Sequence, residues 1–111
     1  MDIVTKFFET ETQIEFITTD GSSWIRNRKG PKFDLIFADA WPGKYSDLDH
    51  TLKLLNPGGF YVIDDMLPQP NWPKGHDLKV NQLMQDLKSK AGFKMTVMNW
   101  STGVVILTKT K

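Results

Sequence analysis

The chain has 111 residues, enough for one small domain over 1–111, and its 40% apolar and 24% charged residues are ordinary for a globular protein. The net charge of +1, with no block of like charge, argues against nucleic acid or a membrane surface as a partner. The sequence contains no cysteine, which excludes a disulfide framework, a thiolate zinc site and a thiol nucleophile. This composition fits a reducing compartment, and the start of the chain does not read as a signal peptide, so we expect a cytoplasmic protein.

Helical and extended patterns alternate along the first third of the chain. Apolar residues at helical spacing predict a short helix over residues 2–9. A strand is expected at Ile14–Thr18, followed by a helix over about 22–28 that is capped by one of its first two residues, both serines. The apolar run from Leu35 to Ala38 predicts a strand covered on both faces, as in a parallel sheet.

The middle of the chain continues this alternation. Leucines at spacings of four and three predict an amphipathic helix over about 46–55, which Asn-Pro-Gly-Gly at 56–59 ends. A second buried strand is expected from Phe60 to Ile63. It leads into residues 66–75, where three prolines and a glycine predict a stiff loop.

The last third predicts a helix over about 76–90 and two strands, Phe93–Trp100 and Gly103–Thr108. The turn between these strands is so short that they must pair antiparallel. Strands and helices in alternation predict an α/β fold with a mostly parallel sheet, to which the hairpin adds one antiparallel strand.

In open α/β sheets, ligands bind beyond the carboxyl ends of the strands. Three polar clusters fall at such ends: Asp20-Gly21-Ser22, Asp39 with Trp41, and Asp64-Asp65. Together, the three later acids offer the oxygen ligands that a hard divalent cation such as magnesium requires. The alternative is that these acids only cap turns and helices, and Asp20-Gly21 in particular is an ordinary turn signal.

Aromatic residues near these acids have two interpretations as well. Trp41 and Tyr45 either form the wall of a pocket for a planar group or anchor the edge of the sheet by packing. The loop that carries Asn71-Trp72 either lies over the crevice and selects the substrate or is a rigid connector. His76, near a helix start, is interpreted as a surface residue, with a role as general base as the alternative.

Residues 33–65 read FDLIFADAWPGKYSDLDHTLKLLNPGGFYVIDD, and this segment resembles S-adenosylmethionine (SAM)-dependent O-methyltransferases of the catechol and caffeoyl-CoA type. Three features match in order. An apolar strand ends in Asp39 with Tyr45 six residues later, a leucine-rich helix ends in LLNPGG, and the next strand ends in an acid pair where those families carry Asp-Asn. The resemblance implies a partial Rossmann-like fold and transfer of a methyl group from SAM to a small-molecule hydroxyl.

The resemblance also implies roles for individual residues. Asp39, Asp64 and Asp65 fall on the metal ligands of the cation-dependent families, where the metal orients the substrate hydroxyl and lowers its pKa. Trp41 matches a residue that packs on the adenine ring. The cofactor-binding residues implied in this way are Asp20, Gly21, Ser22, Asp39, Trp41 and Tyr45.

Two positions depart from the family pattern. The catechol-type general base is a lysine three residues after the first acid, and Pro42 occupies that position here. Lys44, five residues after Asp39, is the remaining candidate, so Asp39 and Lys44 are the candidate catalytic residues. Asp65 replaces the usual asparagine of the acid pair.

The glycine-rich turn after the first strand and the ribose-binding acid of these families do not occur in the 111 residues. Ile14–Thr18 resembles the third strand of the family, so the chain corresponds to the carboxyl-terminal part of the domain with the first two strands missing. We therefore expect this chain alone to bind SAM poorly.

Without those strands, Phe33–Ala38 becomes an exposed, apolar sheet edge, which invites pairing. We expect either that Ile14–Thr18 moves in beside it or that two copies associate there as a homo-oligomer. The alternative function is a non-catalytic α/β module that self-associates or binds a partner through this edge.

Overall fold

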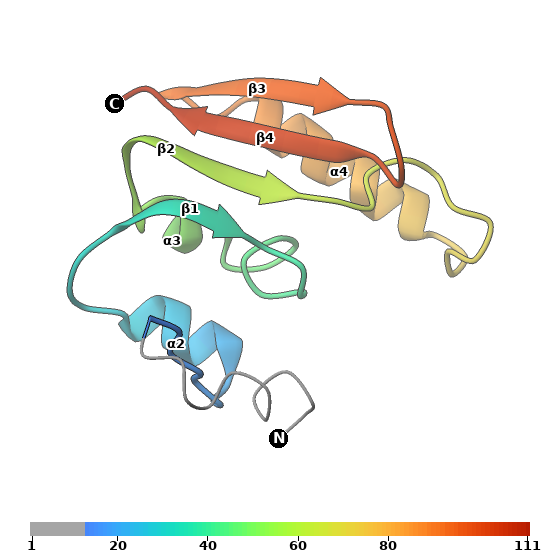
Figure 1. Ribbon diagram of the computed structural model, residues 1–111. Coiled ribbons are helices and arrows are strands. Elements are labelled where there is room, and N and C mark those ends of the chain that lie inside the picture. Colours follow the sequence, from blue (N-terminus) through green and yellow to red (C-terminus); the bar gives the residue numbers. More distant parts are fainter. Residues whose placement is uncertain (1–12) are drawn as a thin grey trace.

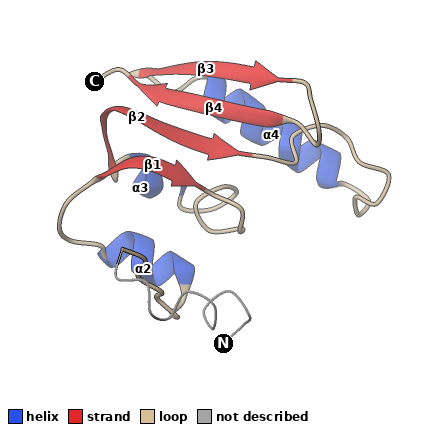
Figure 2. Ribbon diagram, viewed as in Figure 1, coloured by secondary structure: helices blue, strands red, loops and turns tan. Residues whose placement is uncertain are grey.

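The computed structural model describes residues 13–111, and the helix expected over residues 2–9 lies outside this part of the chain. Helices and strands alternate as expected up to the final hairpin (Figures 1 and 2). Their bounds are α2 Gly21–Asn27, β1 Phe33–Phe37, α3 Leu48–Leu52, β2 Leu55–Ile63, α4 His76–Lys88, β3 Phe93–Met98 and β4 Val104–Lys109. Within residues 13–111, none of these helices combines the length and the apolar character needed to cross a membrane.

The four strands form one sheet in the order β1-β2-β4-β3 (Figure 1). β1 and β2 pair in parallel, whereas β4 pairs antiparallel with both β2 and β3. The α/β class and the antiparallel hairpin are thus confirmed, but the mostly parallel arrangement holds for β1 and β2 only. The reason is that β4 folds back from the tight turn after β3 and fills the place between β3 and β2.

The core lies between one face of the sheet and the helices α3 and α4, which the ribbon shows on the same side (Figure 2). Val80, Leu83 and Leu87 recur at spacings of three and four along α4, so one stripe of this helix faces the sheet. The fully buried side chains of the strands are those of Leu55, Tyr61, Ile63, Val105 and Leu107.

The other face of the sheet is open in the described chain. Leu35, Phe37 and Phe60 are 62%, 55% and 46% exposed, and the register pairs Leu35 with Phe60 on that face. The expectation that β1 is covered on both faces is therefore wrong for residues 13–111. The apolar run does form a strand, but α3 and α4 cover only one face of the sheet, so the side chains on the other face are exposed.

Ile14–Thr18 is not a strand, and it does not move in beside β1, which has β2 as its sheet neighbour in the described chain. Ile14 and Ile17 are 42% and 50% exposed, so no sheet face holds their side chains. α2 begins one residue earlier than expected, and its cap is Asp20, whose Oδ2 accepts a hydrogen bond from the Ser23 backbone N–H at 2.9 Å.

The boundary between α3 and β2 also differs from the expectation. α3 ends at Leu52, because the Leu54 carbonyl already accepts a hydrogen bond from the Phe33 N–H at 2.7 Å. β2 therefore starts at Leu55 and includes the Asn-Pro-Gly-Gly segment. Its register with β1 is irregular between the pair Phe33–Leu55 and the pair Leu35–Phe60. Gly59 allows this irregularity, since a Cβ there would lie 2.9 Å from the Asn56 carbonyl oxygen.

Candidate active site

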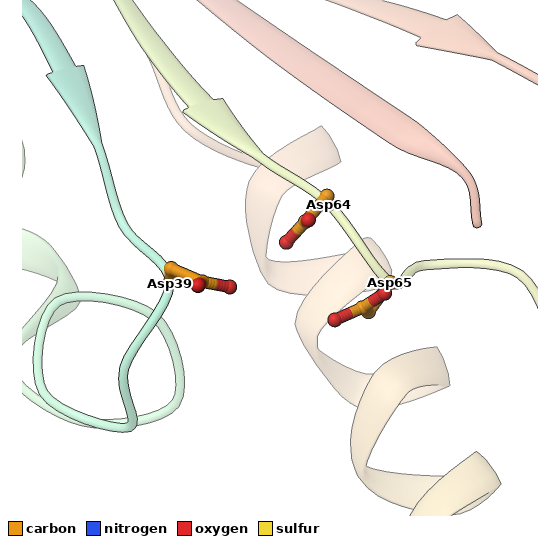
Figure 3. A group of neighbouring side chains, drawn as sticks. All are labelled: Asp39, Asp64 and Asp65. Atoms are coloured by element: carbon orange, nitrogen blue, oxygen red, sulfur yellow. The ribbon is translucent and has the colours of Figure 1, made fainter. Parts of the chain in front are cut away.

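Three carboxylates meet at one edge of the sheet. Asp39 follows β1 and Asp64-Asp65 follow β2, and since these strands are parallel their carboxyl ends lie at the same edge. One oxygen of each carboxylate lies within 4.8 Å of those of the other two. Figure 3 shows Asp39 directed across the space between the strand ends toward Asp64 and Asp65. The structure thus brings together the three acids that the sequence singled out.

The negative charges of the three acids lie close together, and Asp64 is the acid most affected. Burial, then the negative charges of Asp65 and Asp39 and a hydrogen bond with Asp39, raise the pKa of the Asp64 carboxyl, against the opposing effect of Lys44. Asp64 Oδ1 is buried and has no hydrogen-bond partner among residues 13–111. An all-oxygen donor set with one unpartnered atom fits a hard divalent cation such as magnesium.

Lys44 supplies a positive charge next to the three acids. Its side chain is almost fully buried, with the residue 5% exposed, and its Nζ donates a hydrogen bond to the Asp64 backbone carbonyl at 2.7 Å. Burial lowers the pKa of the Lys44 ammonium, and the carboxylates of Asp64, Asp65 and Asp39 oppose this shift. The amine is therefore tied to the end of β2 rather than projecting into solvent.

The loop after β1 is held by its own backbone and by one tyrosine of β2. The Trp41 carbonyl accepts hydrogen bonds from the N–H groups of Lys44, Tyr45 and Ser46 at 3.0 to 3.2 Å. Tyr61 is fully buried, and its hydroxyl donates to the Gly43 carbonyl at 2.6 Å. This bond places the loop that carries Trp41, Lys44 and Tyr45 against the sheet.

Replacing Tyr61 with phenylalanine is expected to lower the free energy of unfolding by about 1–2 kcal/mol, because the Gly43 carbonyl loses its partner while the ring stays in place. Urea denaturation measures this. Tyr45→Phe is the matched control, since the Tyr45 hydroxyl is buried without a partner among the described residues and its removal should cost nothing. Equal losses in both variants would contradict this role of Tyr61.

A cavity of about 410 Å³ opens beside the acids. Four rings form a continuous row along it: the centroids of Trp41 and Tyr45 are 4.7 Å apart, those of Tyr45 and His76 5.7 Å, and those of His76 and Trp72 4.8 Å. The first two rings come from the loop after β1, and the other two come from the proline-rich loop and the start of α4. The cavity therefore lies between two loops that both follow strand ends.

The candidate residues divide into two groups. Those that line the cavity are Asp39, Trp41, Lys44, Tyr45 and Asp65, with Asp64 beside them. Asp20, Gly21 and Ser22 are not among its lining residues.

The second group is engaged elsewhere. Asp20 caps α2, and the bond from the Ser23 backbone lowers its pKa. A side-chain hydrogen bond from Ser22 lowers the pKa of Asp47. Gly21 packs on the Pro42 ring, which a Cβ there would meet at 3.4 Å. The start of α2 thus touches the loop after β1 without adding a polar group to the cavity.

The cavity is also lined by residues that the sequence did not place there, among them His76 and Thr102. His76 was expected at the surface, but it is half-buried between Tyr45 and Trp72. A signal existed, because His76 starts the helix that follows the loop after Asp65, and such a helix begins near the crevice. Thr102, in the hairpin turn, had no such signal, since its place depends on β4 lying next to β2.

No protein-family model matches the sequence, and no curated protein matches it. Solved structures do match. A protein from Corynebacterium glutamicum superimposes with a TM-score of 0.78 at 15% identity, over 96% of this chain and 54% of its own. A methyltransferase from Podospora anserina, solved with S-adenosylhomocysteine bound, gives 0.77 at 17%, over 96% and 53%. A protein from Staphylococcus aureus, provisionally designated a caffeoyl-CoA O-methyltransferase, gives 0.76 at 19%, over 96% and 56%.

These likenesses concern the fold. The chain has the fold of part of a Rossmann-like methyltransferase, as the resemblance implied. It spans about half the length of the solved structures it matches.

Proposed function

We propose that this chain forms the acceptor-facing part of a SAM-dependent O-methyltransferase, which moves a methyl group from the sulfonium of SAM to the hydroxyl of a small molecule. The convergence of Asp39, Asp64 and Asp65 beside an aromatic cavity carries the proposal. The fold supports it, because structural neighbours include proteins solved with SAM or S-adenosylhomocysteine bound.

The three acids would hold a divalent cation such as magnesium. When bound, such a cation acts as a Lewis acid that orients the acceptor hydroxyl and lowers its pKa. The chain's own contribution is to fix the ligands: β1 and β2 place the acids at one edge, and the hydrogen bond from Lys44 holds the end of β2. Most of the acceleration would come from this positioning.

Lys44 and Asp39 remain the candidate catalytic residues. A base must be neutral before it accepts a proton, and burial shifts the Lys44 pKa in that direction. A neutral amine can keep donating to the Asp64 carbonyl while its lone pair takes the proton of the acceptor hydroxyl. The methyl group would then pass to that oxygen by direct displacement at the sulfonium.

On the cofactor side, the rings of Trp41 and Tyr45, 4.7 Å apart, are the candidates for contact with the adenine. Asp39 lines the same cavity as these two rings and is the third candidate on this side. Asp20, Gly21 and Ser22 remain cofactor candidates on the resemblance alone, since their contacts lie within α2, with Asp47 and with Pro42.

Two measurements test the proposal. In the first, titration calorimetry with magnesium should show binding to the wild type that Asp39→Asn removes. In the second, mass spectrometry should detect methyl transfer from SAM to small phenolic hydroxyls, and chelation of the cation should stop it. The isolated chain is expected to bind SAM more weakly than micromolar. If the chain neither binds magnesium nor transfers a methyl group in these two measurements, the proposed function is wrong.

The second candidate function is a non-catalytic module that associates through its open sheet. The observation behind it is the apolar surface of β1 and β2, where Leu35, Phe37 and Phe60 are exposed. Light scattering at increasing concentration should then show a dimer or larger species, with slow amide exchange in residues 34–38. A monomer with rapid exchange throughout that strand would reject this candidate.

A further inference from the structure

We propose that a second cavity, at the end of the sheet opposite the acids, binds a small phosphate monoester with an apolar organic group. The cavity has a volume of about 270 Å³. Its walls come from α3 and the residue after it, from the connection between α4 and β3, and from the ends of the two hairpin strands away from their turn. Its lining residues differ from those of the candidate active site, so the inference does not depend on the proposed function.

The net charge of +1 conceals a separation of charge between the two ends of the sheet. The three converging acids lie where β1 and β2 end. Three lysines, Lys53, Lys90 and Lys109, line the second cavity at the other end, where β2 and β3 begin and β4 ends (Figure 1). An anionic ligand is therefore repelled at the acid end and attracted to this one.

Lys109 provides a positive charge whose described partners are neutral. Its Nζ donates hydrogen bonds to the backbone carbonyls of Leu52 at 3.1 Å and of Leu55 at 2.9 Å. Burial, followed by the positive charge of Lys32, lowers the pKa of the Lys109 ammonium. An anion beside Nζ would offset both effects, and the third N–H of the ammonium group is left to donate to it.

Lys90 already holds an anionic group in this cavity, which is the carboxylate of Asp49. Lys90 Nζ lies 2.8 Å from Asp49 Oδ1, and the Asp49 side chain is 69% exposed. Exposed ion pairs contribute little to stability, because water screens them. A ligand with more negative charge than a carboxylate can therefore take the place of Asp49 beside Lys90.

The charge of the cavity indicates a phosphate rather than a carboxylate. Asp49 offsets one of the three ammonium groups, and the C-terminal ends of α3 and α4, at roughly half a negative charge each, offset about one more. About one positive charge remains, and Lys32 adds to it through its effect on Lys109. A phosphate monoester carries about 1.5 to 2 negative charges at neutral pH, which matches this surplus better than the single charge of a carboxylate.

The uncharged part of the lining indicates an apolar group on the phosphate. Leu52 is buried, Phe93 is half-buried, and Lys109 Nζ lies 5.9 Å from the centroid of the Phe93 ring. An ester that covers these side chains removes apolar surface from water while its phosphate reaches the lysines. The volume is below the roughly 300 Å³ of ordinary ligand pockets, so the organic group is limited to one small ring or a short chain.

The experiment is calorimetry on the full chain with two probes, phenyl phosphate and inorganic phosphate, in a buffer without metal ions. Without a metal ion, neither probe can be bridged to the acids. The affinity for phenyl phosphate should exceed that for inorganic phosphate by about threefold or more, and added salt should weaken both. If neither probe binds, the proposal is overturned, and if inorganic phosphate binds as tightly as the ester, its apolar part is wrong.

Substitutions with opposite effects locate the site. Asp49→Asn removes the competing carboxylate and should raise the affinity for phenyl phosphate by about tenfold, whereas Lys53→Gln should lower it by about tenfold. Lys74→Gln removes a lysine of the proline-rich loop, at the acid end of the sheet, and should leave the affinity unchanged. All three side chains are exposed, so thermal unfolding should show that each variant is folded. An unchanged or lower affinity of Asp49→Asn, or equal effects of the two lysine substitutions, would overturn the proposal.

Discussion

Replacing Asp64 with asparagine is expected to lower the affinity for magnesium on the order of a hundredfold and, at neutral pH, to raise the melting temperature. The affinity falls because one of three converging carboxylates is lost. The stability rises because the charged form of Asp64 is unfavourable in the folded chain, where burial and two neighbouring acids raise its pKa.

The pH dependence of this effect has a definite sign. A carboxyl whose pKa is raised by folding binds its proton more tightly in the folded state, so stability is lost as the pH rises from the unfolded pKa through the folded one. The wild type therefore bears this cost at neutral pH, and Asp64→Asn does not. Below the unfolded pKa, where Asp64 is protonated in both states, the difference in melting temperature should vanish.

Asp77→Asn is the control for the loss of one negative charge. Asp77 lies in the first turn of α4, where a carboxylate stabilises the helix, and it is not in the cluster. This variant should keep its magnesium affinity and melt slightly earlier than the wild type. Calorimetry and thermal unfolding check both variants. A lower melting temperature for Asp64→Asn, or an unchanged magnesium affinity, would refute the interpretation of the cluster as a strained cation site.

The second large effect is expected for Gly103→Ala, which should lower the free energy of unfolding by about 2–4 kcal/mol and weaken magnesium binding. Gly103 has a φ of 92°, and a Cβ there would lie 2.5 Å from the backbone N of Leu67. The turn also bonds to the chain just after Asp65, since the Gly103 carbonyl accepts from the Met66 N–H at 3.2 Å. An alanine would push this segment away and displace the acids.

Gly58→Ala separates the backbone strain of a positive φ from the steric overlap of the added Cβ. Gly58 has a φ of 85°, but a Cβ there would have no atom within 4 Å, so only backbone strain applies. This control should lose about 1 kcal/mol in urea denaturation and keep its magnesium affinity. If Gly103→Ala were no more destabilising than Gly58→Ala, the close packing of the turn against Leu67 would not matter for stability.

Several features of the site could be predicted from local sequence. Asp39 and Asp64-Asp65 follow apolar runs, and acids that end parallel strands share one edge of a sheet, so their convergence needs no further information. The final hairpin is equally local, because a turn of a few residues permits only antiparallel pairing. The expected cap of α2 was two or three residues too late, since serine and aspartate are near-equal caps and packing chooses between them.

Other features depend on contacts between distant segments. Tyr61 reaches the Gly43 carbonyl across 18 positions, and nothing in either segment alone indicates that bond. His76 joins the aromatic row only because α4 packs under the sheet next to the loop of Tyr45.

Local patterns were sufficient to predict the elements from α2 to β4 in order, and the acids at the strand ends, because apolar periodicity and turn chemistry act over a few residues. Contacts between distant segments set three other features: Ile14–Thr18 stays out of the sheet, α3 gives way to β2 at Leu55, and one sheet face is open. A segment forms a strand only where a neighbouring strand pairs with it, so each of these features depends on which segments pack side by side.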